Sequence, residues 1–246
     1  MSSLERALDL LMALEKAGPS MGLSELSRAT GIHKATAQRL LSVLERRGFV
    51  QRMHGRYRVG AAVAPLAYAF LGENSLPAMA RPVLEQLTLI SGETSSLFVR
   101  QGFDRVVIQR VNSPHPLRYS LQIGQRLPLH LGASGRVLAA AMPQEELEQL
   151  LDHVQEARLV SGETLSRQEL CARIEEARQM GFAVSMEERA VGVASVAAPV
   201  TVAGEGTIAA VTIAGPVSRM TAERAQELAA EARRAADEIV RAYARL

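Results

Sequence analysis

The chain has 246 residues, of which 48% are hydrophobic, so it is long enough to bury a sizeable core and to form two domains. Its single cysteine, Cys171, excludes an internal disulfide bond and any metal site built from several cysteines. The charge is uneven, because residues 1–60 carry 10 Lys and Arg against 5 Asp and Glu, whereas residues 61–246 carry 18 against 21. This balance favours a nucleic-acid partner for the N-terminal part.

Neither export nor membrane insertion is expected. The first residues, MSSLERALDLL, include acidic side chains and lack an apolar core followed by a cleavage site, so no signal peptide is evident. The longest apolar runs, such as residues 61–71, are far shorter than the roughly 18 residues that a membrane span needs. The sequence therefore predicts a cytoplasmic protein without a membrane partner.

The N-terminal 60 residues predict three helices. Residues 4–17 form the first, with Leu4, Leu8, Leu11 and Leu14 on one apolar stripe. Residues 23–30 form the second, with Leu23, Leu26 and Ala29 on one face, and Ser24 is the candidate N-cap. Gly31 breaks this helix, and residues 33–47 form the third, which buries Ala37, Leu40, Leu41 and Leu44. Two short helices around a tight turn are typical of a helix-turn-helix.

A basic hairpin follows the third helix. Residues 49–52 and 56–59 alternate as strands do, and Met53-His54-Gly55 can turn the chain between them. Arg52, Arg56 and Arg58 lie in this hairpin, which therefore has the position and charge of a DNA-binding wing.

The polar side of residues 33–47 is the candidate recognition surface, because the major groove admits a helix and presents a different pattern of donors and acceptors for each base pair. Residues in the first turns can reach base edges or phosphates, whereas wing arginines suit the backbone. The predicted DNA-binding residues are His33, Lys34, Thr36, Gln38, Arg39, Arg52 and Arg56. The alternative is a winged helix that docks on a protein, but the basic excess argues against it.

A linking helix is predicted over residues 61–71, and Gly72, Asn74, Ser75 and Pro77 then break it. The predicted domains are therefore 1–60, a winged helix-turn-helix; 61–75, the linking helix; and 76–246, a second domain. The linking helix is so apolar that we expect it to pack on its own domain or on the same helix of a second copy.

The second domain alternates helices and strands. Helices are predicted over residues 78–91, 132–142, 143–151, 166–180 and 221–245, and strands over 93–100, 105–111, 117–121, 182–186, 194–202 and 207–214. Ser166 and Glu169 form a capping box, and Gly181 ends that helix. The prediction is a mixed sheet flanked by helices.

Three segments of the second domain stand out beside the winged helix: LPLHLGASGRVLAA (127–140), GFAVSMEERAVGVASVAAPV (181–200) and AAVTIAGPVSR (209–219). Together with the winged helix, they resemble the IclR family of bacterial transcriptional regulators. The resemblance implies an α+β fold in which the linking helix joins the winged helix to a GAF-like or profilin-like mixed α/β effector-binding domain. It also implies a homodimer or dimer of dimers (homotetramer) that binds operator DNA and responds to a small metabolite. We expect the operator to be a palindrome.

The effector pocket implied by the resemblance lies between the sheet and the helix that opens with small residues. The matching positions are Ala133, Ser134, Ser185, Glu187, Ser195, Thr212 and Ala214. Small residues at a helix start let a ligand reach backbone N–H groups, and the helix dipole there favours a carboxylate or aromatic acid. Arg118 and His130 are further candidates to neutralise an acid. The alternative is that residues 132–135 only permit tight packing of helix against sheet.

An enzyme is the rival class, but the chain has no Gly-x-Ser-x-Gly elbow, His-Glu-x-x-His motif, Walker loop or glycine fingerprint after a strand. Glu187 and Glu188 are adjacent, so on an extended chain only one of them points inward. We therefore predict no catalytic residue, metal or cofactor. The sequence leaves open the effector's identity, the operator, the choice between dimer and tetramer, and whether the effector releases or recruits DNA.

Overall fold

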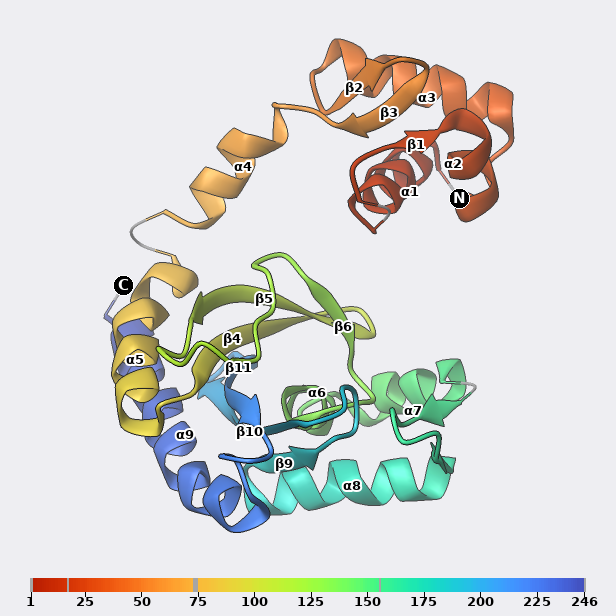
Figure 1. Ribbon diagram of the computed structural model, residues 1–246. Helices are drawn as coiled ribbons and strands as arrows, with labels where there is room; N and C mark the ends of the chain where they lie inside the picture. The colour runs from red at the N-terminus through yellow and green to blue at the C-terminus, as the bar shows by residue number, and fades with distance from the viewer. Residues whose placement is uncertain (1, 17, 73–74, 155, 246) are drawn as a thin grey trace. The chain divides into compact units, whose positions relative to one another are not determined.

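The computed structural model describes residues 2–16, 18–72, 75–154 and 156–245. The chain divides into two compact units, Met1–Gly72 and Glu73–Leu246 (Figure 1). Among the described helices, none is long and apolar enough to cross a membrane.

The first unit is a winged helix-turn-helix followed by a short helix. Its helices are α1 (Ser3–Lys16), α2 (Leu23–Thr30), α3 (Lys34–Arg46) and α4 (Val63–Phe70). Its strands are β1 (Met21–Gly22), β2 (Val50–Met53) and β3 (Arg56–Val59), in the order β1-β3-β2. The two-stranded wing is confirmed. A third strand, β1, was not predicted; it joins the wing by pairing Met21 with Tyr57 of β3.

Leu10, Leu14, Leu26 and Leu41 form the centre of this unit. The predicted stripe of α1 is confirmed at Leu14, which is buried, and in part at Leu11, which packs against the core. It is wrong at Leu4 and Leu8, which are 70% and 52% exposed, while Leu10 is fully buried. The helix is apolar on two sides, and docking against α2 and α3 decides which side is buried. Burial of Ala37, Leu40 and Leu41 on α3 is confirmed, with Leu44 partly buried against the same core.

Local hydrogen bonds fix the ends of these elements. Ser24 is not the N-cap of α2: Gly22 holds that position, and its N–H donates to the Glu25 carboxylate at 2.8 Å. His54 and Gly55 both have positive φ, 49° and 76°, as the tightest hairpin turns require, and this turn sets the register of the wing.

The second unit is a six-stranded sheet in the order β6-β5-β4-β11-β10-β9, with α5 and α9 on one face and α6 against the other (Figure 1). The strands are β4 (Thr94–Gln101), β5 (Asp104–Val111), β6 (Arg126–Pro128), β9 (Ala183–Met186), β10 (Val193–Val202) and β11 (Gly206–Pro216). The helices are α5 (Leu76–Ser91), α6 (Ala133–Ala140), α7 (Gln144–His153), α8 (Arg167–Met180) and α9 (Ala222–Tyr243). β7 (Ala157–Arg158) and β8 (Thr164–Leu165) form a small separate hairpin.

Alternation along the strands divides the core into two layers. Leu97, Val211 and Ile213 pack toward α5 and α9, whereas Phe98 and Ala210 pack toward α6. The capping box of Ser166 and Glu169 is confirmed, and so is Gly181 as the left-handed end of α8.

Two predictions about the sheet are wrong. All pairings within it are antiparallel, so its strands are not mixed in direction. Residues 117–121 form no strand; the short β6 pairs with β5 instead, and Val107 of β5 exchanges backbone bonds with Gly124 and Gln125. Residues 117–121 are thus left as an irregular segment, which carries Tyr119 and Leu121 to the pocket described below.

Candidate functional site

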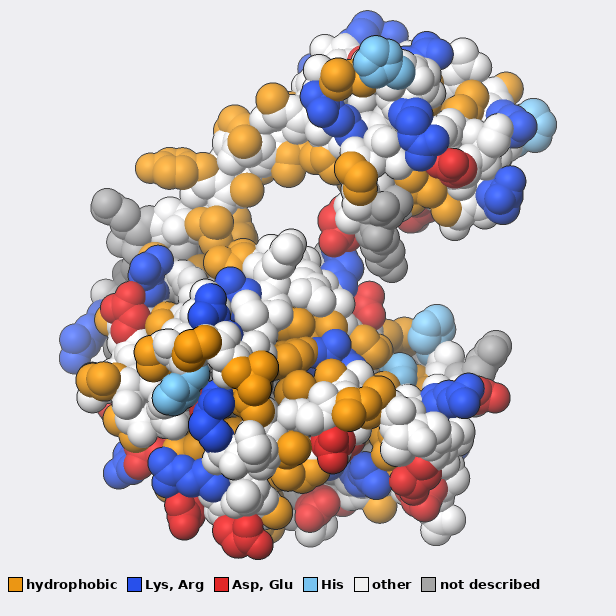
Figure 2. Space-filling view, viewed as in Figure 1, with side chains coloured by type: hydrophobic (Ala, Val, Ile, Leu, Met, Phe, Trp, Pro, Cys, Tyr) orange, Lys and Arg blue, Asp and Glu red, His pale blue; other side chains and the backbone are white. Residues whose placement is uncertain are grey.

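The exposed side of α3 is polar. His33, Lys34, Gln38 and Arg39 are exposed and Thr36 is half-buried, while the opposite side packs into the core. Within the described part of the chain, the side chains of Lys34 and Arg39 have no hydrogen bond or ion pair. These side chains can therefore meet a ligand without breaking an internal contact. Figure 2 shows Lys and Arg side chains over the visible face of this unit.

The wing arginines differ in what holds them. Arg52 is exposed, and its guanidinium carbon lies 5.6 Å from the centre of the Tyr57 ring, which is buried in the core of this unit. Arg56 is paired with Glu25 at 2.9 Å and also donates to the Ser20 carbonyl oxygen and hydroxyl. The bond from the Gly22 N–H, and then Arg56, hold the pKa of Glu25 below its usual value. Arg56 thus fastens the wing to α2, whereas Arg52 is held only by a ring contact.

The same unit leaves two apolar helix surfaces exposed. On α4, Leu66 is 58%, Tyr68 81% and Phe70 54% exposed, and none of its described residues is buried. On α1, Leu4 and Leu8 are exposed on the side away from the core. Such surfaces are unusual on a solvated helix unless another chain covers them.

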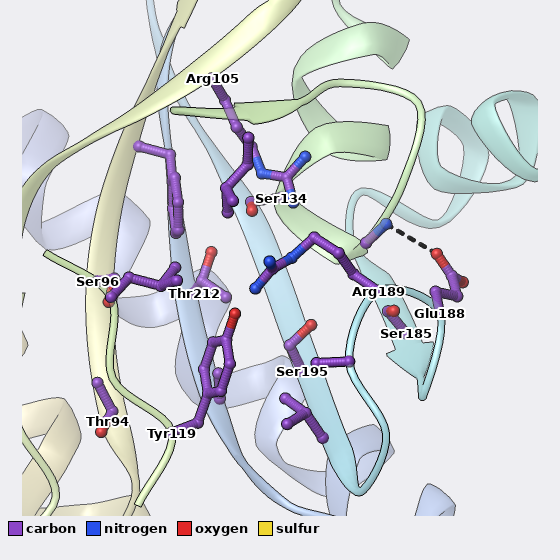
Figure 3. Close-up of a pocket in the computed structure, with 17 residues that line it drawn as sticks. Thr94, Ser96, Arg105, Tyr119, Ser134, Ser185, Glu188, Arg189, Ser195 and Thr212 are labelled. Atoms are coloured by element: carbon purple, nitrogen blue, oxygen red, sulfur yellow. Dashed lines mark hydrogen bonds between the residues drawn. The ribbon is translucent and has the colours of Figure 1, made fainter. Parts of the chain in front are cut away.

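In the second unit, a pocket lies between the sheet and the start of α6 (Figure 3). It has about 540 Å³ of space, part of which is open to solvent. Five of the seven residues predicted for the effector pocket line it: Ser134, Ser185, Ser195, Thr212 and Ala214. Ala133 is packed into the core, and Glu187 is exposed and accepts the Gly192 N–H at 2.6 Å.

Antiparallel register gathers the hydroxyl groups. Ser195 of β10 lies opposite Ser185 of β9 on one side and Ala214 of β11 on the other. Thr212 lies opposite Ser96 of β4. Because side chains two apart share a face of a strand, Thr94 and Ser96 face the pocket together.

Two arginines supply the positive charge of the pocket wall. Arg105 of β5 is 2% exposed, donates to the Pro128 carbonyl and lies over the Phe98 ring at 5.6 Å. Gly135 leaves room for it, since a Cβ there would lie 2.4 Å from the Arg105 Nη1 atom. Burial lowers the pKa of Arg105 to about 9, so the group is still charged at neutral pH. Its Nε has no hydrogen-bond partner among the described residues.

Arg189 comes from the loop 187–192 between β9 and β10. Its side chain crosses the pocket toward Thr212 and Tyr119, and its guanidinium carbon lies 5.5 Å from the centre of the Tyr119 ring (Figure 3). Burial lowers the pKa of Arg189 below its usual value. Arg118 and His130, the cations suggested by the sequence, do not line this pocket; Arg118 donates to the His115 carbonyl at the surface.

Only one member of the acidic pair is buried, as expected, but it is Glu188 and not Glu187, the residue suggested for the pocket. The chain is not extended there, because Glu187 has φ of 51°. The Glu188 carboxylate accepts the Gly132 N–H at 2.8 Å (Figure 3). It also pairs with Arg136 at 2.9 Å and Arg173 at 3.4 Å. The carboxylate of Glu188 is therefore already neutralised by Arg136 and Arg173, which do not line the pocket.

The described residues contain no group of three or more His, Cys, Asp and Glu that could hold a metal ion. The site therefore offers hydroxyl groups, guanidinium groups and one paired carboxylate, which is the chemistry of ligand binding.

Two family models cover most of the chain. The IclR helix-turn-helix domain matches residues 3–53, and the C-terminal domain of the bacterial transcriptional regulator IclR matches residues 68–241. The chain belongs to the IclR family of bacterial transcriptional regulators.

IclR-family proteins of known identity and structure align over nearly the full chain. The transcriptional repressor IclR of Escherichia coli K12 is 31% identical over 245 residues, which are 98% of this chain and 89% of that protein. The repressor AllR of the same strain is 30% identical over 90% of this chain and 83% of its own length. Both relatives are transcriptional repressors.

Two solved structures show the same fold. A putative IclR regulator from Silicibacter sp. TM1040 has a TM-score of 0.89 and 28% identity, with 98% of this chain and 96% of that chain covered. An IclR homologue from Microbacterium hydrocarbonoxydans, crystallised with 4-hydroxybenzoate, has a TM-score of 0.79 and 20% identity over the whole of both chains.

Sequence reasoning missed several pocket residues of this IclR-family chain. The alternation of Thr94 and Ser96 in a buried strand was a usable signal, because hydroxyl groups on the core side of a strand need partners. Arg105 and Arg189 carried no such signal, since an arginine in an amphipathic strand or a loop normally points to solvent.

Proposed function

We propose that this chain is a ligand-responsive transcriptional regulator that acts in the cytoplasm, binds palindromic operator DNA through α3 and the wing, and is modulated by a small carboxylate or aromatic acid. The observation that carries the proposal is the polar side of α3. On the basic unit of the chain, it presents the side chains of Lys34 and Arg39, which have no hydrogen bond or ion pair among the described residues.

The DNA contacts follow from exposure and charge. Lys34, Gln38 and Arg39 extend from the first turns of α3, with His33 and Thr36 beside them, and suit base edges or the nearest phosphates. Arg52, which has no ion pair within the described residues, suits a backbone phosphate. Arg56 is paired with Glu25, so it contacts a DNA phosphate either with that ion pair intact or by exchanging the carboxylate for the phosphate.

The assembly is a homodimer or a dimer of dimers. A second copy of the chain is the partner that fits the exposed α4, because a palindrome requires two identical reading heads related by twofold symmetry. Leu66, Tyr68 and Phe70 would then exchange water for apolar contacts.

The effector site is the pocket of Figure 3, with Ser134, Ser185, Ser195, Thr212 and Ala214 in its wall. A small acid with an apolar body matches a lining of hydroxyls, two arginines and Phe98, Leu121 and Leu127. An effector changes operator affinity only through its different affinity for the DNA-competent and incompetent arrangements, typically by about 1 to 3 kcal/mol. Ala133 and Glu187, which the resemblance also suggested, lie outside the lining and have no direct contact role in this proposal.

In vitro selection tests the DNA part without knowledge of the operator. The full chain is incubated with a random duplex pool, and recovered duplexes are measured by fluorescence anisotropy at several salt concentrations. We expect enrichment of an inverted repeat with half-sites about one helical turn, or a multiple of it, apart. Failure to enrich any sequence, with no binding at low salt, contradicts the proposal and favours the protein-docking alternative.

A further inference from the structure

The charge of the pocket is unbalanced. Arg105 and Arg189 both line it, and neither has an ion pair with any described carboxylate within 4.0 Å. The nearby Glu188 cannot serve both, because its oxygens already bind the Gly132 N–H, Arg136 and Arg173. One cavity therefore holds a buried guanidinium, that of Arg105, and a half-buried one, that of Arg189, and burial is the largest cause of the lowered pKa of each.

Unused hydrogen-bonding groups surround the same space. The Arg105 Nε, the Thr212 Oγ1 and the Tyr119 hydroxyl are buried and have no partner among the described residues. Arg105 and Thr212 are each more than nine-tenths buried. Unsatisfied buried groups of this kind are costly, so their convergence on one pocket points to a ligand that satisfies them.

A single carboxylate carries one negative charge, so it would leave the charge of the buried Arg105 and the half-buried Arg189 only partly neutralised. The two side chains reach the pocket from different walls: Arg105 from β5, beside Ser134, and Arg189 from the loop after β9, across the middle of the cavity (Figure 3). Negative charge at two separated positions matches this arrangement better than charge at one centre, because each guanidinium can then form its own charge-assisted hydrogen bonds.

We propose that the effector of this pocket is a short dicarboxylate, with one carboxylate bound by Arg105 and the other by Arg189 together with the hydroxyls of Thr212 and Tyr119. This inference rests on the proposed effector function of the same pocket. Phe98, Leu121 and Leu127 cover the carbon chain between the two carboxylates. Arg189, whose guanidinium carbon lies 5.5 Å from the centre of the Tyr119 ring, binds the second carboxylate.

Isothermal titration calorimetry on the full chain tests the proposal with malonate, succinate, glutarate and adipate, each compared with its own monoamide. The monoamide keeps size and shape but removes one charge. We expect at least one dicarboxylate to bind about tenfold or more tightly than its monoamide, as the loss of a hydrogen bond between charged groups implies. Inorganic phosphate and 4-hydroxybenzoate test a single-centre anion and an aromatic monoacid.

Arg189→Gln then locates the second carboxylate. It should weaken the dicarboxylate about tenfold or more and leave the monoamide within about threefold, so that the preference disappears. The matched control is Arg81→Gln, an exposed arginine on α5 paired with Glu85, which should change neither affinity. Arg105→Gln is the riskier variant, because Arg105 is fully buried and holds Pro128; the proposal is therefore judged on Arg189→Gln.

The outcomes separate this inference from the proposed function. Dicarboxylates that bind no better than their monoamides, or a preference that survives Arg189→Gln, overturn the dicarboxylate assignment. Binding by phosphate or 4-hydroxybenzoate alone overturns it too, but leaves an effector pocket in place. If no acid of either kind binds while an operator is selected, the dicarboxylate and the small-acid part of the proposed function both fail, and DNA binding stands.

Discussion

Removing the Glu188 carboxylate should destabilise the second unit more than removing any surface acid. Glu188 is buried beside Arg136, whose side chain is 7% exposed, and their charged atoms are 2.9 Å apart. At an effective dielectric constant of about 20, such a pair attracts by roughly 6 kcal/mol, most of which offsets the cost of removing both charges from water. In Glu188→Ala the desolvation of Arg136 remains but the attraction is lost, so we expect a loss of about 3 to 5 kcal/mol.

Calorimetric unfolding of the full chain at pH 7 measures this effect. For a unit of this size, a loss of that order lowers the transition temperature by about 6 to 20 °C. Glu85→Gln is the control, because Glu85 is exposed and pairs with Arg81 one helical turn away, and it should cost at most about 0.5 kcal/mol. A second variant, Glu188→Gln, keeps an acceptor for the Gly132 N–H and should lose less than Glu188→Ala.

Coupling distinguishes the ion pair from simple packing. The double variant Glu188→Gln with Arg136→Met removes both charges of the pair, so neither is left buried without its partner. Its loss of unfolding free energy should therefore be smaller than the sum of the losses of the two single variants. If Glu188→Ala unfolds at the temperature of the Glu85→Gln control, or the two losses add, the buried pair does not carry the stability assigned to it.

Four further expectations concern DNA, assembly and ligand. Lys34→Ala and Arg39→Ala should each cost about 1 to 3 kcal/mol in anisotropy titrations on a selected operator if the side chain contacts a base, and wild-type affinity in both would contradict the recognition role of α3. Arg52→Ala should weaken specific and random DNA alike and reduce the salt slope by about one; an unchanged slope argues against a phosphate contact. Tyr68→Glu should shift the oligomer toward monomer in sedimentation, since that side chain is 81% exposed within one chain, and an unaltered dimer would place the interface elsewhere. Ser134→Leu should fill the pocket and abolish ligand-induced thermal shifts with operator affinity intact; equal ligand binding would move the site.

Much of the first unit follows from local sequence. The spacing of Ala37, Leu40 and Leu41 predicts both α3 and the side of it that is buried, because residues three and four apart share one side of a helix. His54-Gly55 and the alternation around it predict the wing, since few residues accept two positive φ angles in succession. The choice of the buried side of α1 was not predictable in the same way, because that helix has apolar residues on two sides.

Part of the pocket follows from sequence as well. The small residues at the start of α6 and the hydroxyls of Ser185, Ser195 and Thr212 could be assigned to the pocket from the sequence. The family resemblance made this possible, because it indicates which segments of the chain form the effector pocket. Physical chemistry adds why such residues suit a ligand: they leave space beside backbone N–H groups and supply convergent donors.

Only the tertiary structure decided which charges enter that pocket. Arg105 and Arg189 are separated by almost half of the second unit in sequence, and neither stands out among its sequence neighbours. The antiparallel order β5-β4-β11-β10-β9 brings their elements around one cavity, and Gly135 leaves the space that Arg105 fills. Side-chain patterns determine local elements because they depend on residues a few positions apart, whereas the electrostatics of a cavity depend on the register of strands that are distant in the chain.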